Sequence, residues 1–485
     1  MNPWVYIIVL FLGLTIVLLK SKHERHFLFF MIRTQYGIGL IDRLAGLSHE
    51  FWKILGDLGI LASLSGTGAY YISKRGDLRN LSNIMAFLGV FGVFALNVSI
   101  PVKVVGLVLV FLVLEAARRI GNSVVNFFVA SLIISMIASG FMSEWYYAVI
   151  FGFFGFPALI ITALLMQAYN IIQGSMLPGV SPMLPSTKDG QIGVGFPGYD
   201  LFIPWTYALI AVIATLVPHE LAHGILSRVH HVRLKSTGLL TFGGLPLGAF
   251  VEPNERSLKS KSSLSRTRIY AIGSLANFFT AILAVLVLIT MNLGLAQFVL
   301  SDGVLVVGLD KGYPADKVLE QGVVIYALNN YPLSGTASFE EAARPLKPKD
   351  NVVLNTSKGL LSFKAGESPV DKEKGYMGVL VMDNVKVKYN IPEWLINFSI
   401  INFVIISLWW IIFFNASIGM VNLLPIPPFD GYHIMGEVVH STDMKKEDVK
   451  WAIYGIILIT ALIFFLNMLP LIRMAFKPVL SYFGF

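Results

Sequence analysis

Long apolar runs separated by short polar segments dominate the N-terminal third of this chain. A helix that crosses a bilayer needs about 20 consecutive apolar residues, and each run is close to that length. The first run has Lys20 and Lys22 behind it and no basic residue ahead of it, which predicts a retained anchor rather than a signal peptide. The pattern predicts an N-terminal transmembrane bundle of about six spans over residues 1–172: Pro3–Leu19, Ile54–Ile72, Leu81–Ser99, Val102–Ala117, Val124–Phe141 and Trp145–Ile172.

The second half of the chain continues this pattern with two interruptions. Residues 173–203 are rich in Gly and Pro and carry few charges, which predicts a linker or a re-entrant loop. Gly238–Val251 is too short to span a bilayer and too rich in Gly for a helix, so we expect a membrane-associated β-hairpin or a re-entrant loop there. The predicted spans are Trp205–Val229, Ile269–Leu293, Trp394–Leu424, and one or two more within Trp451–Phe485.

The apolar pattern gives way over residues 297–389 to short alternating segments that are typical of a soluble α+β domain. Helical pieces are predicted at Ala315–Glu320 and Phe339–Ala343. We expect a groove between the first strand and the second helix, for peptide docking or for excluding bulky substrates, although a folded insert with an empty groove fits the same pattern. The predicted strands are Gly303–Leu309, Val323–Leu328, Val352–Asn355, Leu360–Lys364 and Met377–Met382.

Composition agrees with a polytopic membrane protein. Hydrophobic residues make up 55% of the 485 residues and charged residues 14%, and the mean hydropathy is +0.70. The net charge of +8 comes from Lys and Arg beside apolar runs, a pattern of membrane orientation and not of nucleic-acid binding. The basic cluster after Val229 predicts that this end of the span is cytoplasmic, with the 297–389 domain on the opposite, extracytoplasmic side.

One predicted span contains an unusual cluster of ionisable residues, in the motif HExxH. His219 and His223 are four residues apart, so they lie on one face of a helix, where two imidazoles can bind one metal ion. Glu220 lies beside them, where a general base would act. Two histidines satisfied by neighbouring groups are the alternative, but ionisable residues inside a membrane span are expensive and usually functional. The chain has no cysteine, so a metal must be held by His, Asp or Glu.

A third ligand has to come from another segment, and Asp430 is the strongest candidate. It follows a break marked by Pro425, Pro427 and Pro428 at the expected cytoplasmic end of a span, and Gly431 beside it permits an unusual backbone angle. An ordinary turn aspartate is the alternative interpretation. Weaker candidates are Glu252, His433 and Glu437, whereas His230, His231 and His440 are expected to be interfacial or solvated.

Together these motifs resemble the site-2 protease family of intramembrane zinc metalloproteases. The sequence His219-Glu-Leu-Ala-His-Gly224, the pair Gly273 and Asn277, and the stretch from Asn422 to Gly431 occur in the family's order. The family often has Pro after the glycine of its middle motif, whereas Ser274 follows Gly273 here. The resemblance implies one Zn²⁺ bound by His219, His223 and Asp430, with Glu220 as the catalytic base. It also implies that Asn277 and Asn422 help to position the substrate.

The resemblance further implies the fold and the function. We expect a polytopic α-helical membrane protein with a membrane-associated β-hairpin and an inserted α+β PDZ-like domain. The catalytic transmembrane core would comprise residues 204–296 and 390–485, interrupted by the PDZ-like domain at 297–389. The expected activity is zinc-dependent cleavage of transmembrane segments of membrane proteins or peptides, in regulated intramembrane proteolysis, by a multi-pass protein of the cell membrane.

Two other functions remain open at this point. The His/Glu cluster could bind ions in a transporter or channel, which would predict paired broken helices in repeated halves, and no such repeat is visible. A catalytically silent membrane scaffold would be expected to lack one of the four site residues, yet all four are present. For the protease, we expect an unwound substrate segment to add as a strand to the Gly238–Val251 hairpin.

Overall fold

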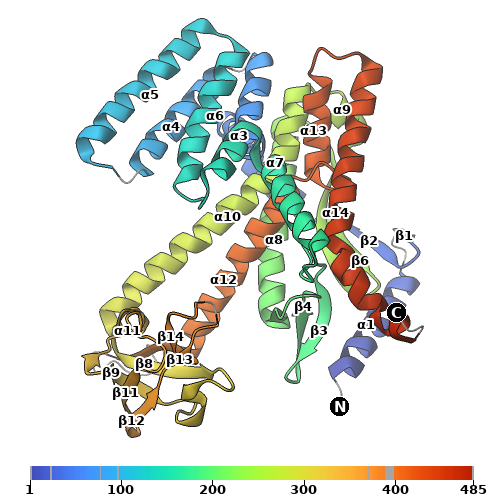
Figure 1. The fold of residues 1–485 in the computed structure, drawn as a ribbon. Coiled ribbons are helices and arrows are strands. Elements are labelled where there is room, and N and C mark those ends of the chain that lie inside the picture. The colour runs from blue at the N-terminus through green and yellow to red at the C-terminus, as the bar shows by residue number, and fades with distance from the viewer. Residues whose placement is uncertain are drawn as a thin grey trace. The chain divides into compact units, whose positions relative to one another are not determined.

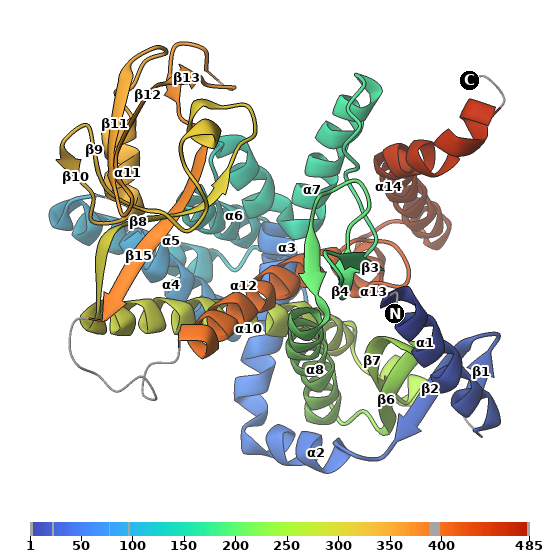
Figure 2. The same ribbon diagram turned by 90° about the horizontal axis from the view of Figure 1, so that it is seen from below.

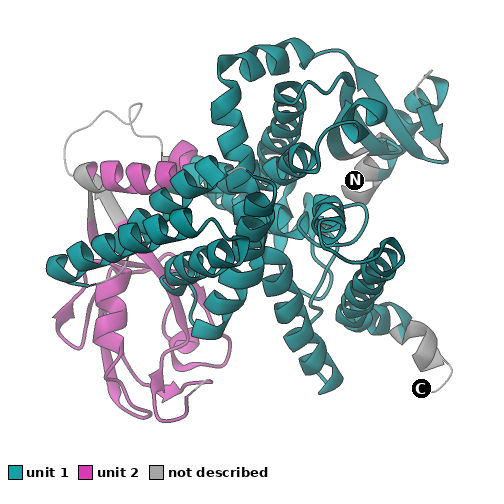
Figure 3. Ribbon diagram, turned by 90° about the horizontal axis from the view of Figure 1, so that it is seen from above, with its two compact units in different colours: residues 1–285, 404–485 teal, residues 286–403 magenta. Residues whose placement is uncertain are grey.

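The computed structural model describes residues 3–21, 24–76, 78–95, 98–369, 371–387 and 398–482. The chain divides into two compact units, coloured teal and magenta in Figure 3. Unit 1 comprises Met1–Val285 and Val404–Phe485, and unit 2 comprises Leu286–Phe403. All of the predicted site residues therefore belong to unit 1.

Helices occupy each of the predicted N-terminal spans. Of these helices, α5 and α7 are long and apolar enough to cross a membrane, whereas α4 and α6 are shorter apolar helices and α3 is largely buried in unit 1. The chain direction breaks within α3 at Ser65 and within α7 at Gly155. The bounds are α1 Pro3–Lys20, α2 Ile38–Leu47, α3 His49–Lys74, α4 Leu78–Ala95, α5 Ile100–Ile120, α6 Ser123–Ser139 and α7 Trp145–Ile172.

The second half of the chain supplies four further helices of spanning length. They are α8, α10, α12 and α14, so six helices among the described residues are long and apolar enough to cross a membrane. Such a set is typical of an integral membrane protein. The bounds are α8 Trp205–Val229, α9 Glu255–Lys259, α10 Ser263–Phe298, α12 Phe398–Val421, α13 Asp430–His440 and α14 Lys446–Tyr482.

The predicted β-hairpin is present as part of a larger sheet. Strands β6 (Leu234–Phe242) and β7 (Leu245–Pro253) pair with each other, and β2 (Phe29–Thr34) and β1 (Glu24–His26) extend the sheet in the order β1-β2-β6-β7. Figures 1 and 2 show α1 beside this sheet, and Thr15 Oγ1 of α1 accepts a hydrogen bond from the backbone N–H of Gly244 at the hairpin turn. One edge of the hairpin is thus covered by the N-terminal segment, while β7 remains an edge strand.

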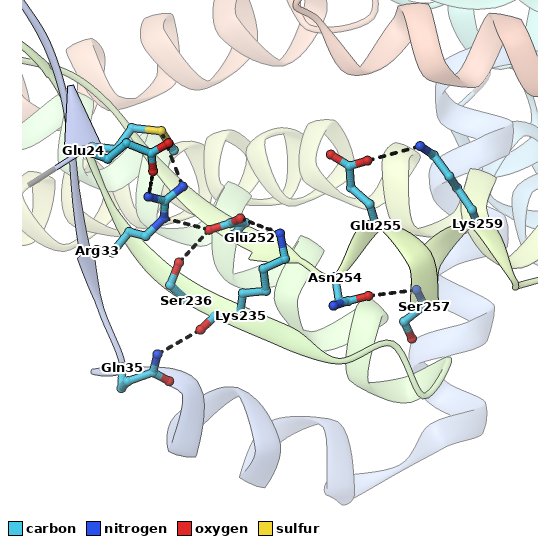
Figure 4. A network of polar contacts seen from close by, with 11 residues as sticks. Glu24, Arg33, Gln35, Lys235, Ser236, Glu252, Asn254, Glu255, Ser257 and Lys259 are labelled. Atoms are coloured by element: carbon cyan, nitrogen blue, oxygen red, sulfur yellow. Dashed lines mark hydrogen bonds and ion pairs between the residues drawn. The ribbon is translucent and has the colours of Figure 1, made fainter. Parts of the chain in front are cut away.

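Polar contacts tie the open end of this sheet together (Figure 4). Arg33 on β2 donates to Glu252 on β7 over 2.9 Å and also contacts Glu24. Lys235 and Ser236 on β6 each donate to Glu252 over 2.9 Å. The Glu252 carboxylate therefore links β2, β6 and β7 at the end of the sheet opposite the hairpin turn, which we call the base of the sheet.

The segment between α7 and α8 differs from the predicted linker. It contains a three-stranded antiparallel sheet in the order β3-β4-β5. The Gly and Pro content of this segment predicted a loop, but apolar residues alternate with Gln and Gly in Gln191–Gly195, as is typical of a strand. The bounds are β3 Leu184–Lys188, β4 Gln191–Gly195 and β5 Phe202–Pro204.

Unit 2 is the predicted α+β domain. Its main sheet has the order β12-β11-β9-β8-β15, with β10 paired to β9, around a core that includes Val304, Ile325 and Leu354. Strand β8 pairs with β15 on one side and, at Val304 and Leu305, with β9 on the other. The bounds are β8 Val299–Leu309, η1 Pro314–Lys317, β9 Val324–Leu328, β10 Tyr331–Pro332, α11 Thr336–Ala343, β11 Asn351–Thr356, β12 Gly359–Lys364, β13 Gly366–Glu367, β14 Gly375–Tyr376 and β15 Val379–Val387.

Candidate metal centre

Helix α8 presents its two motif histidines to the interior of unit 1. His219 and His223 are one turn apart on the same helix face, and their Nε2 atoms are 3.1 Å apart. Their side chains are only 7% and 14% exposed. Two imidazole nitrogens this close cannot both carry a proton toward each other, so they either share one proton or bind one cation.

Asp430 reaches the same point from a separate segment. Helix α12 ends at Val421, and α13 begins at Asp430. The intervening loop is closed by Gly431, whose backbone N–H donates to the carbonyl of Asn422 over 2.7 Å. Asp430 Oδ2 thereby lies 3.2 Å from Nε2 of His223 and 3.3 Å from Nε2 of His219. The Pro-rich break thus serves to turn the chain and aim this carboxylate at the histidines.

The three side chains fit a zinc ion by chemistry and by spacing. One ligand atom of each of them lies within 4.8 Å of the others. A tetrahedral zinc with bonds of about 2.0 to 2.1 Å separates its ligand atoms by about 3.3 Å, and the three distances here are 3.1, 3.2 and 3.3 Å. Three protein ligands leave a fourth position for water, as catalytic zinc sites require. We refer to His219, His223 and Asp430 as the His–His–Asp cluster.

Glu220 lies beside the cluster and is held by the β-sheet. Its Oε2 accepts a hydrogen bond from the backbone N–H of Val251 on β7, over 2.9 Å. Helix α8 and strand β7 pack against each other. The candidate base therefore points toward the edge of β7, and its position depends on that strand as well as on α8.

The close approach of α10 to the cluster requires a glycine at position 273. A Cβ atom on Gly273 would lie 2.3 Å from Nε2 of His223 and 2.6 Å from Cε1 of His219. Such distances are far inside van der Waals contact, so any larger residue would displace an imidazole. Gly273 is thus a structural requirement of the cluster, and Ser274 beside it is fully buried.

Helix α10 also orients both histidines through hydrogen bonds. Nδ1–H of His223 donates to the carbonyl of Ile269 over 2.6 Å, and the side-chain amide of Asn277 lies 3.2 Å from Nδ1 of His219. The amide atom at this distance is Nδ2, so Asn277 holds the His219 ring in place, while His223 donates its Nδ1–H and keeps its Nε2 lone pair toward Asp430. Asn277 is fully buried and contacts His219, and its expected role in positioning substrate stays a prediction.

Asn422 lies on the other side of His219. Its side-chain Nδ2 is 3.4 Å from Nε2 of His219, the atom that faces Asp430. Unlike Asn277, Asn422 is only partly buried. A role for Asn422 in positioning substrate stays a prediction.

The weaker ligand candidates lie outside the cluster. His433 stacks on Tyr270 with ring centroids 4.8 Å apart, and Glu437 accepts from Arg266 over 2.6 and 2.8 Å. Both contacts join α13 to α10, so they fix the helix that begins with Asp430. Glu252 binds the sheet base, and His440 bonds the carbonyl of Gly436.

Two groups that hold the site could not be found from the motifs. The Ile269 carbonyl and the Val251 N–H belong to the backbone, so no residue type marks them. A buried ion pair supports the first of them, since Arg268, next to Ile269, bonds Asp57 on α3 over 2.6 and 2.7 Å. Asp57, a charged residue inside the predicted span Ile54–Ile72, was the available signal for this pair.

The comparisons with known proteins cover the segments that carry this site. The sequence profile of peptidase family M50 matches residues 207–466, which include α8, the hairpin, α10, unit 2 and the segment with Asp430. An uncharacterised protein of Methanocaldococcus jannaschii is 29% identical over 288 residues, which cover 58% of this chain and 69% of that protein.

Proposed function

This chain belongs to peptidase family M50, and from this membership and the His–His–Asp cluster we propose that it is a zinc-dependent intramembrane endopeptidase. The observation that carries the proposal is the convergence of His219, His223 and Asp430, from two separate helices, at the spacing of a tetrahedral metal site. The proposed substrates are transmembrane segments of other membrane proteins, cleaved in regulated intramembrane proteolysis.

The residues around the cluster divide the chemistry between them. When zinc is bound, it supplies a Lewis acid for the scissile carbonyl and lowers the pKa of bound water to about 7. Glu220 is placed to accept the proton of the attacking water and to pass it to the leaving amide nitrogen. The Ile269 carbonyl keeps the His223 imidazole in the tautomer that leaves Nε2 free, and Asn277 holds the His219 ring in place. The apolar helices around the site restrict bulk water.

A helical substrate hides its carbonyls in its own hydrogen bonds, so it has to unwind before it is cut. The edge of β7 offers a partner for the unwound segment, because β7 ends the sheet and its Val251 already contacts Glu220. We propose that the substrate adds as a strand to β7. The scissile bond of the substrate would then lie beside Glu220.

For unit 2 we propose a PDZ-like domain that limits access of bulky substrates. The groove expected between Gly303–Leu309 and the Phe339–Ala343 helix stays a prediction, but β8 is paired on both sides at Val304 and Leu305. A peptide cannot add as a strand there. Replacing residues 300–385 by a flexible linker should admit substrates with large extracytoplasmic domains. Unchanged exclusion of such substrates would contradict the filter.

The Lys and Arg residues after α8 support a cytoplasmic location for that end of the helix and an extracytoplasmic location for unit 2. The chain has no cysteine, so single cysteines can report the side directly. In intact cells, an impermeant maleimide should label Ser357→Cys on unit 2 and spare Ser260→Cys after α9. The reverse labelling would contradict this orientation.

The proposed activity is tested with Glu220→Gln in the full-length protein. Wild type should hold about one zinc per chain and cleave a transmembrane reporter. The variant should keep the zinc, and its cleavage rate should fall by about 10²-fold to 10⁴-fold, the usual contribution of general acid–base catalysis. Glu255→Gln, on the exposed helix α9, is the matched control and should cleave normally. Undiminished cleavage by Glu220→Gln would refute the proposal.

The same experiment distinguishes the protease from the two alternatives, a transporter and a silent scaffold. A transporter would move ions without cutting the reporter, and a silent scaffold would bind substrate and leave it intact. Both would give wild-type protein that holds zinc and shows no cleavage. Membership of a peptidase family favours the protease over both.

A further inference from the structure

A polar pocket lies where α8 leaves the predicted membrane span. Its volume is about 420 Å³, and its polar lining comes from two places in the chain. Asp42 and His49 lie at α2 and the start of α3, whereas Arg228, His231 and Arg233 lie at the end of α8 and just beyond it. Because α8 is long and apolar enough to span a membrane and ends at Val229, this pocket is expected at the membrane–water boundary.

The pocket carries an excess of positive charge. Asp42 pairs with Arg228 over 2.7 Å, so these two charges offset each other. Within the described part of the chain, no carboxylate lies within ion-pair distance of Arg233, which is exposed. The rings of His49 and His231 meet edge to face, with centroids 5.9 Å apart. One unpaired guanidinium and two imidazoles thus surround a small volume, a combination that suits a phosphate group.

His231 adopts a backbone conformation that argues for a role of its side chain. Its φ is +55°, the left-handed conformation in which helices commonly end on glycine or asparagine. The turn is closed by the N–H of Val232, which donates to the carbonyl of Ser227 over 2.7 Å. Backbone strain of this kind in a non-glycine residue is found disproportionately at functional sites.

Helix α2, which forms one wall, has the character of an interfacial helix. Its buried face places Ile41 against Gly224, immediately after the second histidine of the HExxH motif. Its other face exposes Leu40 (52%) and Leu47 (74%). An amphipathic helix with exposed apolar side chains beside basic groups is typical of contact with anionic lipid.

We propose that this pocket binds the phosphate-bearing headgroup of an anionic membrane lipid, with the exposed face of α2 among its acyl chains. Arg233 and the two imidazoles hold the phosphate, and Leu40 and Leu47 contact the hydrocarbon. Since Ile41 packs on Gly224, a bound lipid also steadies α8 beside His223. The lipid site stands apart from the proposed proteolysis and can be tested without substrate.

The test uses the thermal unfolding midpoint of the full-length protein in neutral detergent. Short-chain phosphatidylglycerol should raise the midpoint in a saturable way, because a ligand that binds only the folded state stabilises it. Short-chain phosphatidylcholine, which is zwitterionic, should raise it much less. Inorganic phosphate at the same concentrations tests the other source of the group. An equal shift with free phosphate would show an anion site without lipid specificity, and would overturn the lipid proposal.

Variants connect the shift to the pocket. Arg233→Gln should weaken phosphatidylglycerol binding about fivefold, the usual effect of one basic charge at an anionic lipid surface. His231→Gly should also weaken binding, while its unfolding midpoint without lipid should not fall, because glycine relieves the left-handed strain. Lys445→Gln, an exposed cation between α13 and α14, is the control. A wild-type response from both pocket variants would refute the site.

Discussion

Arg268 and Asp57 form a doubly hydrogen-bonded ion pair one residue from the carbonyl that orients His223. Their side chains are 6% and 0% exposed. The pair joins α3, which lies outside the region matched by the family profile, to α10 inside it. The N-terminal bundle therefore contributes to the rigidity of the candidate metal centre and is not a detachable addition.

Breaking this pair should be strongly destabilising. Asp57→Ala leaves the guanidinium of Arg268 buried without its main partner, which typically costs about 3 to 5 kcal/mol of folding free energy. The midpoint of thermal unfolding should fall, and zinc affinity with it. The double variant Asp57→Leu with Arg268→Met removes both charges and should regain much of the stability. A double variant no more stable than Asp57→Ala would show that the charges act independently.

Gly273→Ala should abolish metal binding with little loss of helix stability. The added methyl group would lie 2.3 Å from Nε2 of His223, so an imidazole has to move. Zinc content should fall to background, as measured by atomic absorption. Gly294→Ala is a matched control on the same helix, because no atom lies within 4 Å of its added Cβ. It should keep its zinc and gain about 0.5 to 1 kcal/mol of stability.

The two asparagines beside His219 should differ in their effects. Asn277→Ala removes the group that fixes the His219 ring, so zinc affinity should fall about 10-fold to 100-fold. Asn422→Ala should leave zinc affinity close to wild type and raise KM for a peptide substrate. Competition with a chelator gives the first quantity and steady-state cleavage the second. Loss of zinc in both variants would mean that both residues serve the ligand.

Ala249→Pro tests strand addition to β7. Val251 directs its N–H away from β6, to Glu220, and Ala249, two residues earlier in the same register, directs its N–H to the same free edge. Proline there removes that donor and spares the bonds to β6. Cleavage should fall at least 10-fold while zinc is retained. Ala249→Val keeps the N–H and should cleave normally. Normal cleavage by the proline variant would exclude pairing at this position.

The base of the sheet should weaken in acid through Glu252. Partial burial raises the pKa of this carboxyl, but hydrogen bonds from Lys235, Ser236 and Arg33 outweigh it and lower the pKa from 4.5 to about 2. A lowered pKa stabilises the fold above about pH 4.5, and the contribution is lost as pH falls toward 2. Wild type should unfold at a higher temperature than Glu252→Gln at pH 6. The difference should shrink between pH 4.5 and 3. A constant difference would contradict this role.

The pattern of apolar runs was sufficient to predict most helices and the β-hairpin, because both have strong local signals. The HExxH spacing and the Pro-rich break before Asp430 predicted which residues meet in the cluster. The pairing of strands that are far apart in the chain could not be predicted from the sequence. No strand was predicted at Phe29–Thr34, yet this segment pairs with β6 about 200 residues later. The register of such a pair depends on tertiary packing and not on local composition.

The order of the strands in unit 2 could not be predicted for a related reason. Strand positions in residues 297–389 were predicted well, but strand order was not, and order decides which edges are free. The pairing of β8 with β9 at Val304, for example, does not follow from the strand positions alone. The contacts of Asn277 and Gly273 with the two imidazoles likewise depend on how α10 packs against α8, which local sequence does not determine.

The pairing of β2 with β6 can form only after β6 has been synthesised, long after β2. Gln35, just after β2, bonds Lys235 across a separation of 200 residues, and α3 to α8 are made in between. At translation rates of about 5 to 20 residues per second, β2 waits about 10 to 40 s for its partner. During that interval the ribosome-bound chain presents an unpaired strand edge, a ready template for misassembly. Delivery of the hairpin, long after the first helices have inserted, is what ends this exposure.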